Sequence, residues 1–103
     1  FGGGTPSLLE THEINQIINM IDDSFQIAAN AEITLEANPD DCSDDFLKAL
    51  KNETPVNRLS MGVQSFFDDD LKYLHRVHQG SDARKAIESA LKNGFHNMSI
   101  DLI

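Results

Sequence analysis

The amino-acid sequence predicts an α/β protein whose parallel strands form part of a barrel with a polar interior. First, segments of strand period alternate with segments of helical period along the 103 residues. Such alternation is typical of parallel strands joined by right-handed crossovers. Second, each internal strand has one apolar and one polar face, whereas a doubly wound sheet is apolar on both faces. A barrel that holds a polar ligand fits this pattern best.

Three internal strands are predicted, over residues 32–38, 58–64 and 97–103. Their apolar faces should pack beneath the helices, because apolar residues recur there at every second position. The opposite, polar faces carry Thr34, Glu36 and Asn38, then Ser60, Gly62 and Gln64, then Ser99 and Asp101. Phe1 is predicted to end a further strand, and residues 2–6 form the turn that follows it.

Four helices are predicted between these strands. Isoleucines at helical spacing indicate an amphipathic helix over 11–25, with Thr11 as its N-cap. Ser43 is expected to cap a second, short helix. A third helix covers 68–73, and a fourth covers 81–93 and is closed by Gly94.

Composition excludes several classes of function. The chain has 17 acidic and 8 basic residues, a net charge of −9, which argues against nucleic-acid binding. No window approaches the roughly 18 apolar residues of a membrane span. The single cysteine, Cys42, excludes an intrachain disulfide and a cysteine-based metal site. We therefore expect a cytoplasmic protein without a membrane span.

The chain begins and ends inside predicted strands, which indicates a piece of a longer protein. We therefore expect residues 1–103 to be the central part of a larger domain. Such a piece would expose sheet edges at its first and last strands, and exposed edges pair with other chains. Self-association of the isolated piece is the expected consequence.

Polar groups gather where the predicted strands end. In barrels the chemistry lies at the carboxyl ends of the strands, and Glu36, Gln64 and Asp101 lie at or near those ends, as does the GGGTP turn. Glycines there let the backbone approach a ligand closely. The alternatives are a plain tight turn, structural carboxylates and, for Arg76, an ordinary surface charge.

Five segments carry a resemblance to a known family: FGGGTPSLL, EITLEANPDD, NRLSMGVQSF, LHRVH and NMSIDLI. In this order and spacing they resemble the radical S-adenosylmethionine (SAM) family of oxygen-independent coproporphyrinogen III oxidases, which includes the HemN oxidases and the HemW heme chaperones. The resemblance implies a partial, TIM-like (β/α)6 barrel. It also implies that SAM contacts seven residues: Gly3, Gly4, Thr5, Glu36, Gln64, Arg76 and Asp101.

One departure from the family concerns its [4Fe–4S] cluster, which a CxxxCxxC-type motif binds. The chain lacks this motif, whose family position precedes the glycine turn. We therefore expect the cluster in the full-length protein only, no metal ligand in residues 1–103, and no activity of this piece alone.

Within the family, PSLL, GVQSF and HRVH resemble the HemW branch, which implies a tetrapyrrole partner, heme. The alternative is a true oxidase, which converts propionate side chains of coproporphyrinogen III to vinyl groups, so enzymatic activity stays open. A reading of another class is a non-catalytic α/β binding module with structural polar faces.

Overall fold

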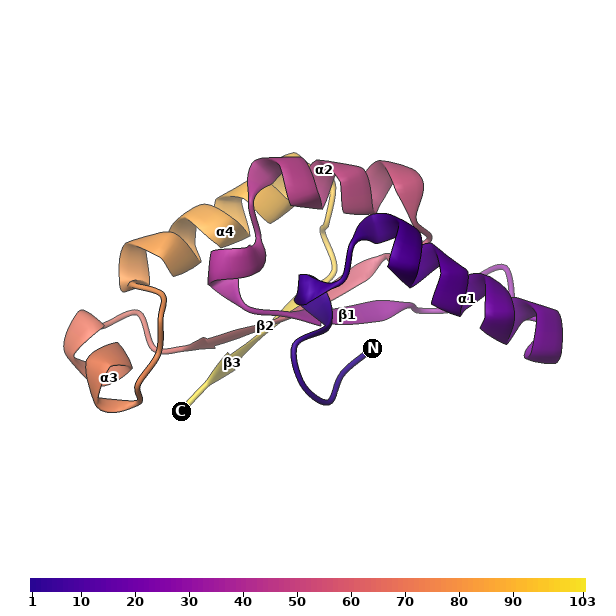
Figure 1. The fold of residues 1–103 in the computed structure, drawn as a ribbon. Coiled ribbons are helices and arrows are strands. Elements are labelled where there is room, and N and C mark those ends of the chain that lie inside the picture. Colours follow the sequence, from indigo (N-terminus) through magenta and orange to yellow (C-terminus); the bar gives the residue numbers. More distant parts are fainter.

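A three-stranded parallel sheet forms the centre of the computed structural model, which describes all 103 residues. The strands β1 (Thr34–Ala37), β2 (Arg58–Gln64) and β3 (Met98–Leu102) lie in chain order. The helices α1 (Thr11–Phe25), α2 (Asp44–Glu53) and α4 (Gly80–Lys92) cover one face, and α3 (Asp68–Tyr73) lies near the far end of β2 (Figure 1). This arrangement confirms the predicted α/β class with parallel strands.

Phe1 lies beside β1 as one further position of the ladder. Its amino group donates to Thr34 O at 2.6 Å, and Glu36 N donates to Phe1 O at 2.9 Å. These two hydrogen bonds join Phe1 to the residues on either side of Leu35, which is the pattern of a parallel pair. The glycine turn that follows Phe1 therefore begins at the carboxyl end of the sheet.

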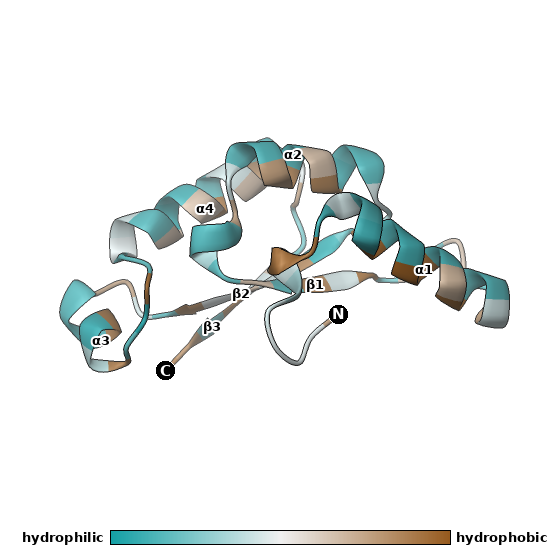
Figure 2. Ribbon diagram, in the orientation of Figure 1, coloured by the Kyte–Doolittle hydropathy of each residue, from teal (hydrophilic) through white to brown (hydrophobic).

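The core lies between the sheet and its helices. The side chains of β1 and β2 that face the helices, among them Leu35, Leu59, Met61 and Val63, are at most 5% exposed. Apolar residues on the undersides of α1, α2 and α4 meet them (Figure 2). The polar residues of the strands consequently lie on the opposite face, as the period of two predicts.

Most predicted helix boundaries are confirmed. The helices at 11–25 and 68–73 match their predicted ranges, and α4 is shifted by one residue from the predicted 81–93. Ser43 caps α2, because its Oγ accepts the Phe46 N–H at 3.1 Å. Gly94 follows α4 with a φ of 94°, which glycine adopts readily.

Two predictions are wrong. Thr11 is not the N-cap of α1: Glu10 is, in a reciprocal capping box with Glu13, and the Thr11 hydroxyl donates to Glu53 instead. The apolar face of β3 is also not buried throughout, since Ile100 and Leu102 are 39% and 62% exposed. As the last strand of the sheet, β3 has a neighbour only on its β2 side.

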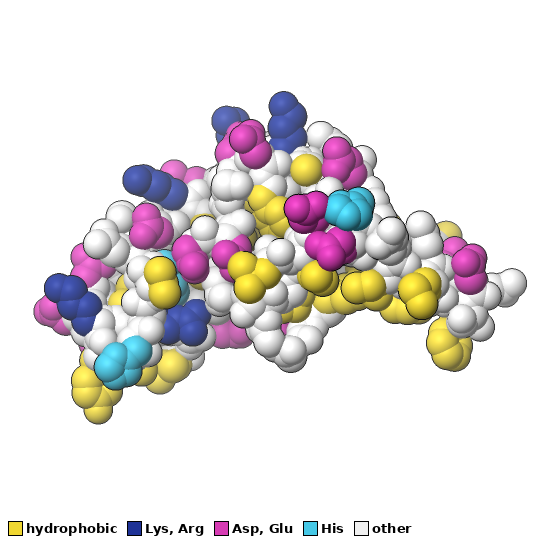
Figure 3. Space-filling model, viewed as in Figure 1, with side chains coloured by type: hydrophobic (Ala, Val, Ile, Leu, Met, Phe, Trp, Pro, Cys, Tyr) yellow, Lys and Arg dark blue, Asp and Glu magenta, His cyan; other side chains and the backbone are white.

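Two short 3₁₀ helices were not predicted, η1 (Pro6–Leu8) and η2 (Pro39–Asp41). Each begins at a proline, whose ring fixes φ near the value that a helical turn needs. None of the four α-helices combines the length and the apolar character that a membrane-spanning helix requires. Figure 3 shows acidic side chains over the helical face, where the basic side chains do not gather into one patch.

Candidate ligand-binding site

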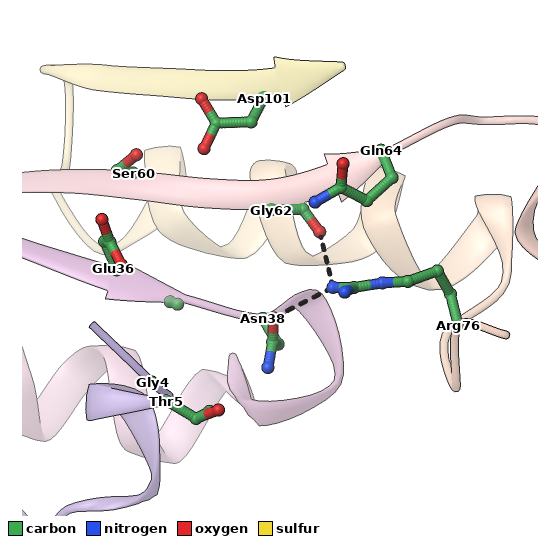
Figure 4. Close-up of a pocket in the computed structure, with 10 residues that line it drawn as sticks. Gly4, Thr5, Glu36, Asn38, Ser60, Gly62, Gln64, Arg76 and Asp101 are labelled. Atoms are coloured by element: carbon green, nitrogen blue, oxygen red, sulfur yellow. Dashed lines mark hydrogen bonds between the residues drawn. The ribbon is translucent and has the colours of Figure 1, made fainter. Parts of the chain in front are cut away.

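A polar pocket of about 230 Å³ lies at the carboxyl ends of the strands, on the face away from the helices (Figure 4). Its lining has one hydrophobic member among ten residues. These residues are Gly4, Thr5, Glu36, Ala37, Asn38, Ser60, Gly62, Gln64, Arg76 and Asp101. Glu36 and Ser60 lie toward one end of the pocket, and Gln64 and Arg76 lie toward the other.

The glycine turn lies against the Glu36 carboxylate. Gly3 N donates to Glu36 Oε2 at 3.3 Å. A Cβ at Gly2 would lie 2.7 Å from both Cδ and Oε1 of Glu36, so only glycine leaves room for the carboxylate there. Gly3 and Gly4 have φ values of 76° and 123°, which residues with side chains rarely adopt. The turn therefore needs Gly3 and Gly4 for its conformation, and Gly2 leaves the space that the Glu36 carboxylate occupies.

Arg76 replaces a backbone donor that the sheet lacks. Thr34 is paired with Arg58, so the β1–β2 register carried four residues further pairs residue 38 with Gly62. In a parallel ladder the Gly62 carbonyl would then accept from the N–H of the residue that follows, residue 39. Residue 39 is proline, which has no N–H. The Arg76 guanidinium donates to Gly62 O at 3.2 Å and to Asn38 Oδ1 at 3.1 Å, both through Nη2.

The hydrogen bonds to Gly62 and Asn38 also hold the positively charged guanidinium of Arg76 at the pocket. Arg76 is half-buried and forms no ion pair, and only Nη2 has a partner in the chain. The other guanidinium N–H groups are therefore free to donate to a ligand. The surface-charge alternative for Arg76 does not fit this placement.

The strands supply the remaining polar groups. Gln64 comes from the end of β2, and its amide Nε2 would lie 3.3 Å from a Cβ at Gly62. The amide thus lies over a position that has no side chain. Asp101 comes from β3. On the same polar face, the Ser99 hydroxyl donates a hydrogen bond to the Ser60 hydroxyl at 3.2 Å.

The charges of the pocket suit a particular kind of ligand. Two carboxylates, Glu36 and Asp101, and one guanidinium, Arg76, line it, so its formal charge is negative. A ligand with a carboxylate for the guanidinium and an excess of positive charge would be complementary. Ribose-type hydroxyls could donate to either carboxylate.

Six of the seven residues predicted to contact a ligand line this one pocket. The seventh, Gly3, does not line it, but donates to Glu36 from the same turn. Four lining residues were not among the predicted contacts: Ala37, Asn38, Ser60 and Gly62. For three of them a signal existed, because Asn38, Ser60 and Gly62 belong to the polar strand faces.

Cys42 is not suited to bind a metal or to act as a nucleophile. It is 6% exposed, and burial, with smaller contributions from Asp41 and Asp40, raises its thiol pKa to about 12. The thiolate, the form that binds metals, is therefore disfavoured. Nowhere in the structure do three or more His, Cys, Asp or Glu side chains lie together in a group that could hold a metal ion.

The fold and the pocket define a segment of a parallel βα barrel with a polar site at the carboxyl ends of its strands. The model of the radical SAM superfamily matches residues 1–103. The chain belongs to this superfamily.

Two relatives within the superfamily show which of its members the chain is similar to. The chain is 44% identical over 103 residues to the heme chaperone HemW of Bacillus subtilis, covering 99% of this chain and 27% of that protein. It is 38% identical to the mitochondrial radical S-adenosyl methionine domain-containing protein 1 of Bos taurus, covering 100% of this chain and 23% of that protein.

Among solved structures, coproporphyrinogen III oxidase (HemN) of Escherichia coli, a radical SAM enzyme, superposes with a TM-score of 0.84 at 35% identity. The match covers 98% of this chain and 23% of that one. The chain is thus homologous to HemW and HemN proteins, and HemW proteins fit best. It spans about a quarter of the length of these relatives.

Proposed function

We propose that this chain is the SAM-binding part of a HemW-like heme chaperone. The observation that carries the proposal is the pocket that gathers Glu36, Gln64, Arg76 and Asp101 beside the glycine turn. SAM has a carboxylate, an ammonium group, a sulfonium and a ribose, with one positive charge in excess. These groups match the negative pocket and its single guanidinium.

Each residue has a role that its chemistry allows. Glu36 would accept ribose hydroxyls, and Arg76 would donate to the methionine carboxylate. Backbone carbonyls of Gly3, Gly4 and Thr5 would accept from the ammonium group. Gln64 and Asp101 would complete the polar wall. When bound beside a reduced cluster, SAM supplies a 5′-deoxyadenosyl radical.

The residues of this chain do not fit the [4Fe–4S] cluster. Such a cluster is held by several cysteine thiolates, and the one cysteine, Cys42, is buried beside α2 with a raised thiol pKa. We therefore propose that the ligands lie outside residues 1–103 of a longer protein, of which this chain is the central barrel segment. A cytoplasmic location is part of the same proposal.

The first experiment measures SAM binding to the full-length protein by anaerobic calorimetry after iron and acid-labile sulfide analysis. Glu36→Gln removes a charge at nearly constant shape, and we expect about tenfold weaker binding, since hydrogen bonds to charged groups contribute about 1.5–3 kcal/mol. Glu88→Gln is the matched control, because Glu88 is exposed on α4 away from the pocket. Equal affinities in both variants would favour the non-catalytic binding module.

A second experiment separates the chaperone from the oxidase. The identity is higher to the heme chaperone of Bacillus subtilis, 44%, than to HemN, 35%, which favours the chaperone. A chaperone should bind heme, visible as a shifted Soret band, and leave coproporphyrinogen III unchanged. Release of carbon dioxide from that substrate would instead establish the oxidase alternative.

A further inference from the structure

The end of β2 contains a strained turn centred on Gln64. Gln64 has a φ of 68°, and the Ser65 N–H donates to Val63 O at 2.8 Å across it. A backbone hydrogen bond between residues i and i+2, with a positive φ at the residue between them, defines the rare and strained type of γ-turn. A residue other than glycine stays in such a conformation only where its surroundings hold it there.

His78 is one of the groups that hold this turn. Its side chain is buried, 3% exposed, and Nε2 lies 2.8 Å from Val63 O. Because a carbonyl oxygen only accepts, Nε2 carries the hydrogen of this bond. Nδ1 is buried and has no partner, so the bond to Val63 is the only polar contact of the ring.

The segment after α3 thereby contacts two consecutive carbonyls of β2. Arg76 donates to Gly62 O, and His78 donates to Val63 O. The Val63 carbonyl and the Gln64 N–H belong to one planar peptide unit, so fixing the oxygen restricts the φ of Gln64. The side chain of Gln64 then folds back over Gly62 and lines the pocket.

We propose that His78 is a positioning residue for the ligand site: it holds the Val63 carbonyl and so keeps Gln64 in the conformation that lines the pocket. The effect on the turn is independent of the ligand, whereas the effect on SAM rests on the proposed function. The alternative is a buried histidine that contributes to stability only.

The turn itself is tested by hydrogen–deuterium exchange on the full-length protein, read at the peptide that contains Ser65. His78→Leu removes the N–H donor at similar size, and His78→Gln keeps an N–H at similar reach. We expect exchange about 2- to 10-fold faster in His78→Leu, the effect of losing one typical hydrogen bond, and near wild-type exchange in His78→Gln. His96→Leu, an exposed histidine, is the control.

SAM affinity is then measured in a double-mutant cycle with Gln64→Ala. If His78 acts through Gln64, His78→Leu weakens SAM binding about 2- to 10-fold in the wild-type background and has no further effect beside Gln64→Ala. An equal loss in both backgrounds, or unchanged exchange at Ser65, overturns the proposal. Should His78→Leu fail to fold, His78→Asn, too short to reach Val63, takes its place against His78→Gln.

The two hypotheses fail separately. A wild-type protein that binds no SAM would refute the proposed function, and exchange at Ser65 would still decide whether His78 holds the turn. A protein that binds SAM, but whose exchange at Ser65 is the same in all variants, would refute the role of His78 alone.

Discussion

Gly2→Ala should move the Glu36 carboxylate without altering any charge. The added methyl would lie 2.7 Å from Cδ and Oε1 and 2.9 Å from Oε2 of Glu36. Since carbon atoms prefer separations of about 3.5 Å or more, the carboxylate must shift by about 0.8 Å. Glu36 is exposed and flexible, so it can shift, and the φ of Gly2 is one that alanine can adopt. The fold should therefore be retained.

The cost should appear in ligand binding. A shift of that size disrupts the hydrogen bonds that the carboxylate would make to SAM, which amounts to about 1–2 kcal/mol. We expect about 5- to 30-fold weaker SAM binding and a thermal midpoint within about 2 °C of wild type. Both quantities are measured on the full-length protein, by anaerobic calorimetry and by scanning fluorimetry.

A double mutant tests the reasoning. Beside Glu36→Ala, the three atoms nearest to the methyl of Gly2→Ala are absent, and the additional loss of affinity should vanish. A similar loss in both backgrounds would show that the turn itself, and not the position of Glu36, determines binding. Unchanged affinity in Gly2→Ala alone would refute the role assigned to Glu36.

Further predictions concern stability and association. Gly80→Ala would place a methyl 2.1 Å from the backbone oxygen of Phe66 and should lower the free energy of unfolding by about 3 kcal/mol, measured by urea titration. Ser43→Ala removes the acceptor of the Phe46 N–H and should lower it by about 1 kcal/mol in the same assay. Burial raises the pKa of Cys42 to about 12, so its thiol ionises only in the unfolded chain between pH 9 and 12. Stability should therefore fall with rising pH there, by up to about 1.4 kcal/mol per pH unit relative to Cys42→Ala; equal slopes in the two proteins would contradict this. The 103-residue polypeptide should self-associate through the free edge of β3, and a monomer by light scattering would count against it.

Local periodicity was enough to predict the helices and the two faces of the strands. The isoleucines of α1 and the alternating residues of β2 leave one arrangement that buries the apolar groups, so both ranges are confirmed. The pocket followed from the same pattern, because the carboxyl ends of parallel strands lie at one edge of the sheet. Glu36, Gln64 and Asp101 accordingly line one cavity.

Tertiary structure alone decided what depends on pairing between distant residues. Arg76 contacts Gly62 because register places Pro39, which has no N–H, where a donor would otherwise lie. The positive φ of Gln64 is stabilised by His78, fourteen positions further along the chain. The exposure of β3 reflects its place at the end of the sheet, and no local pattern of apolar residues specifies which strand lies at an edge.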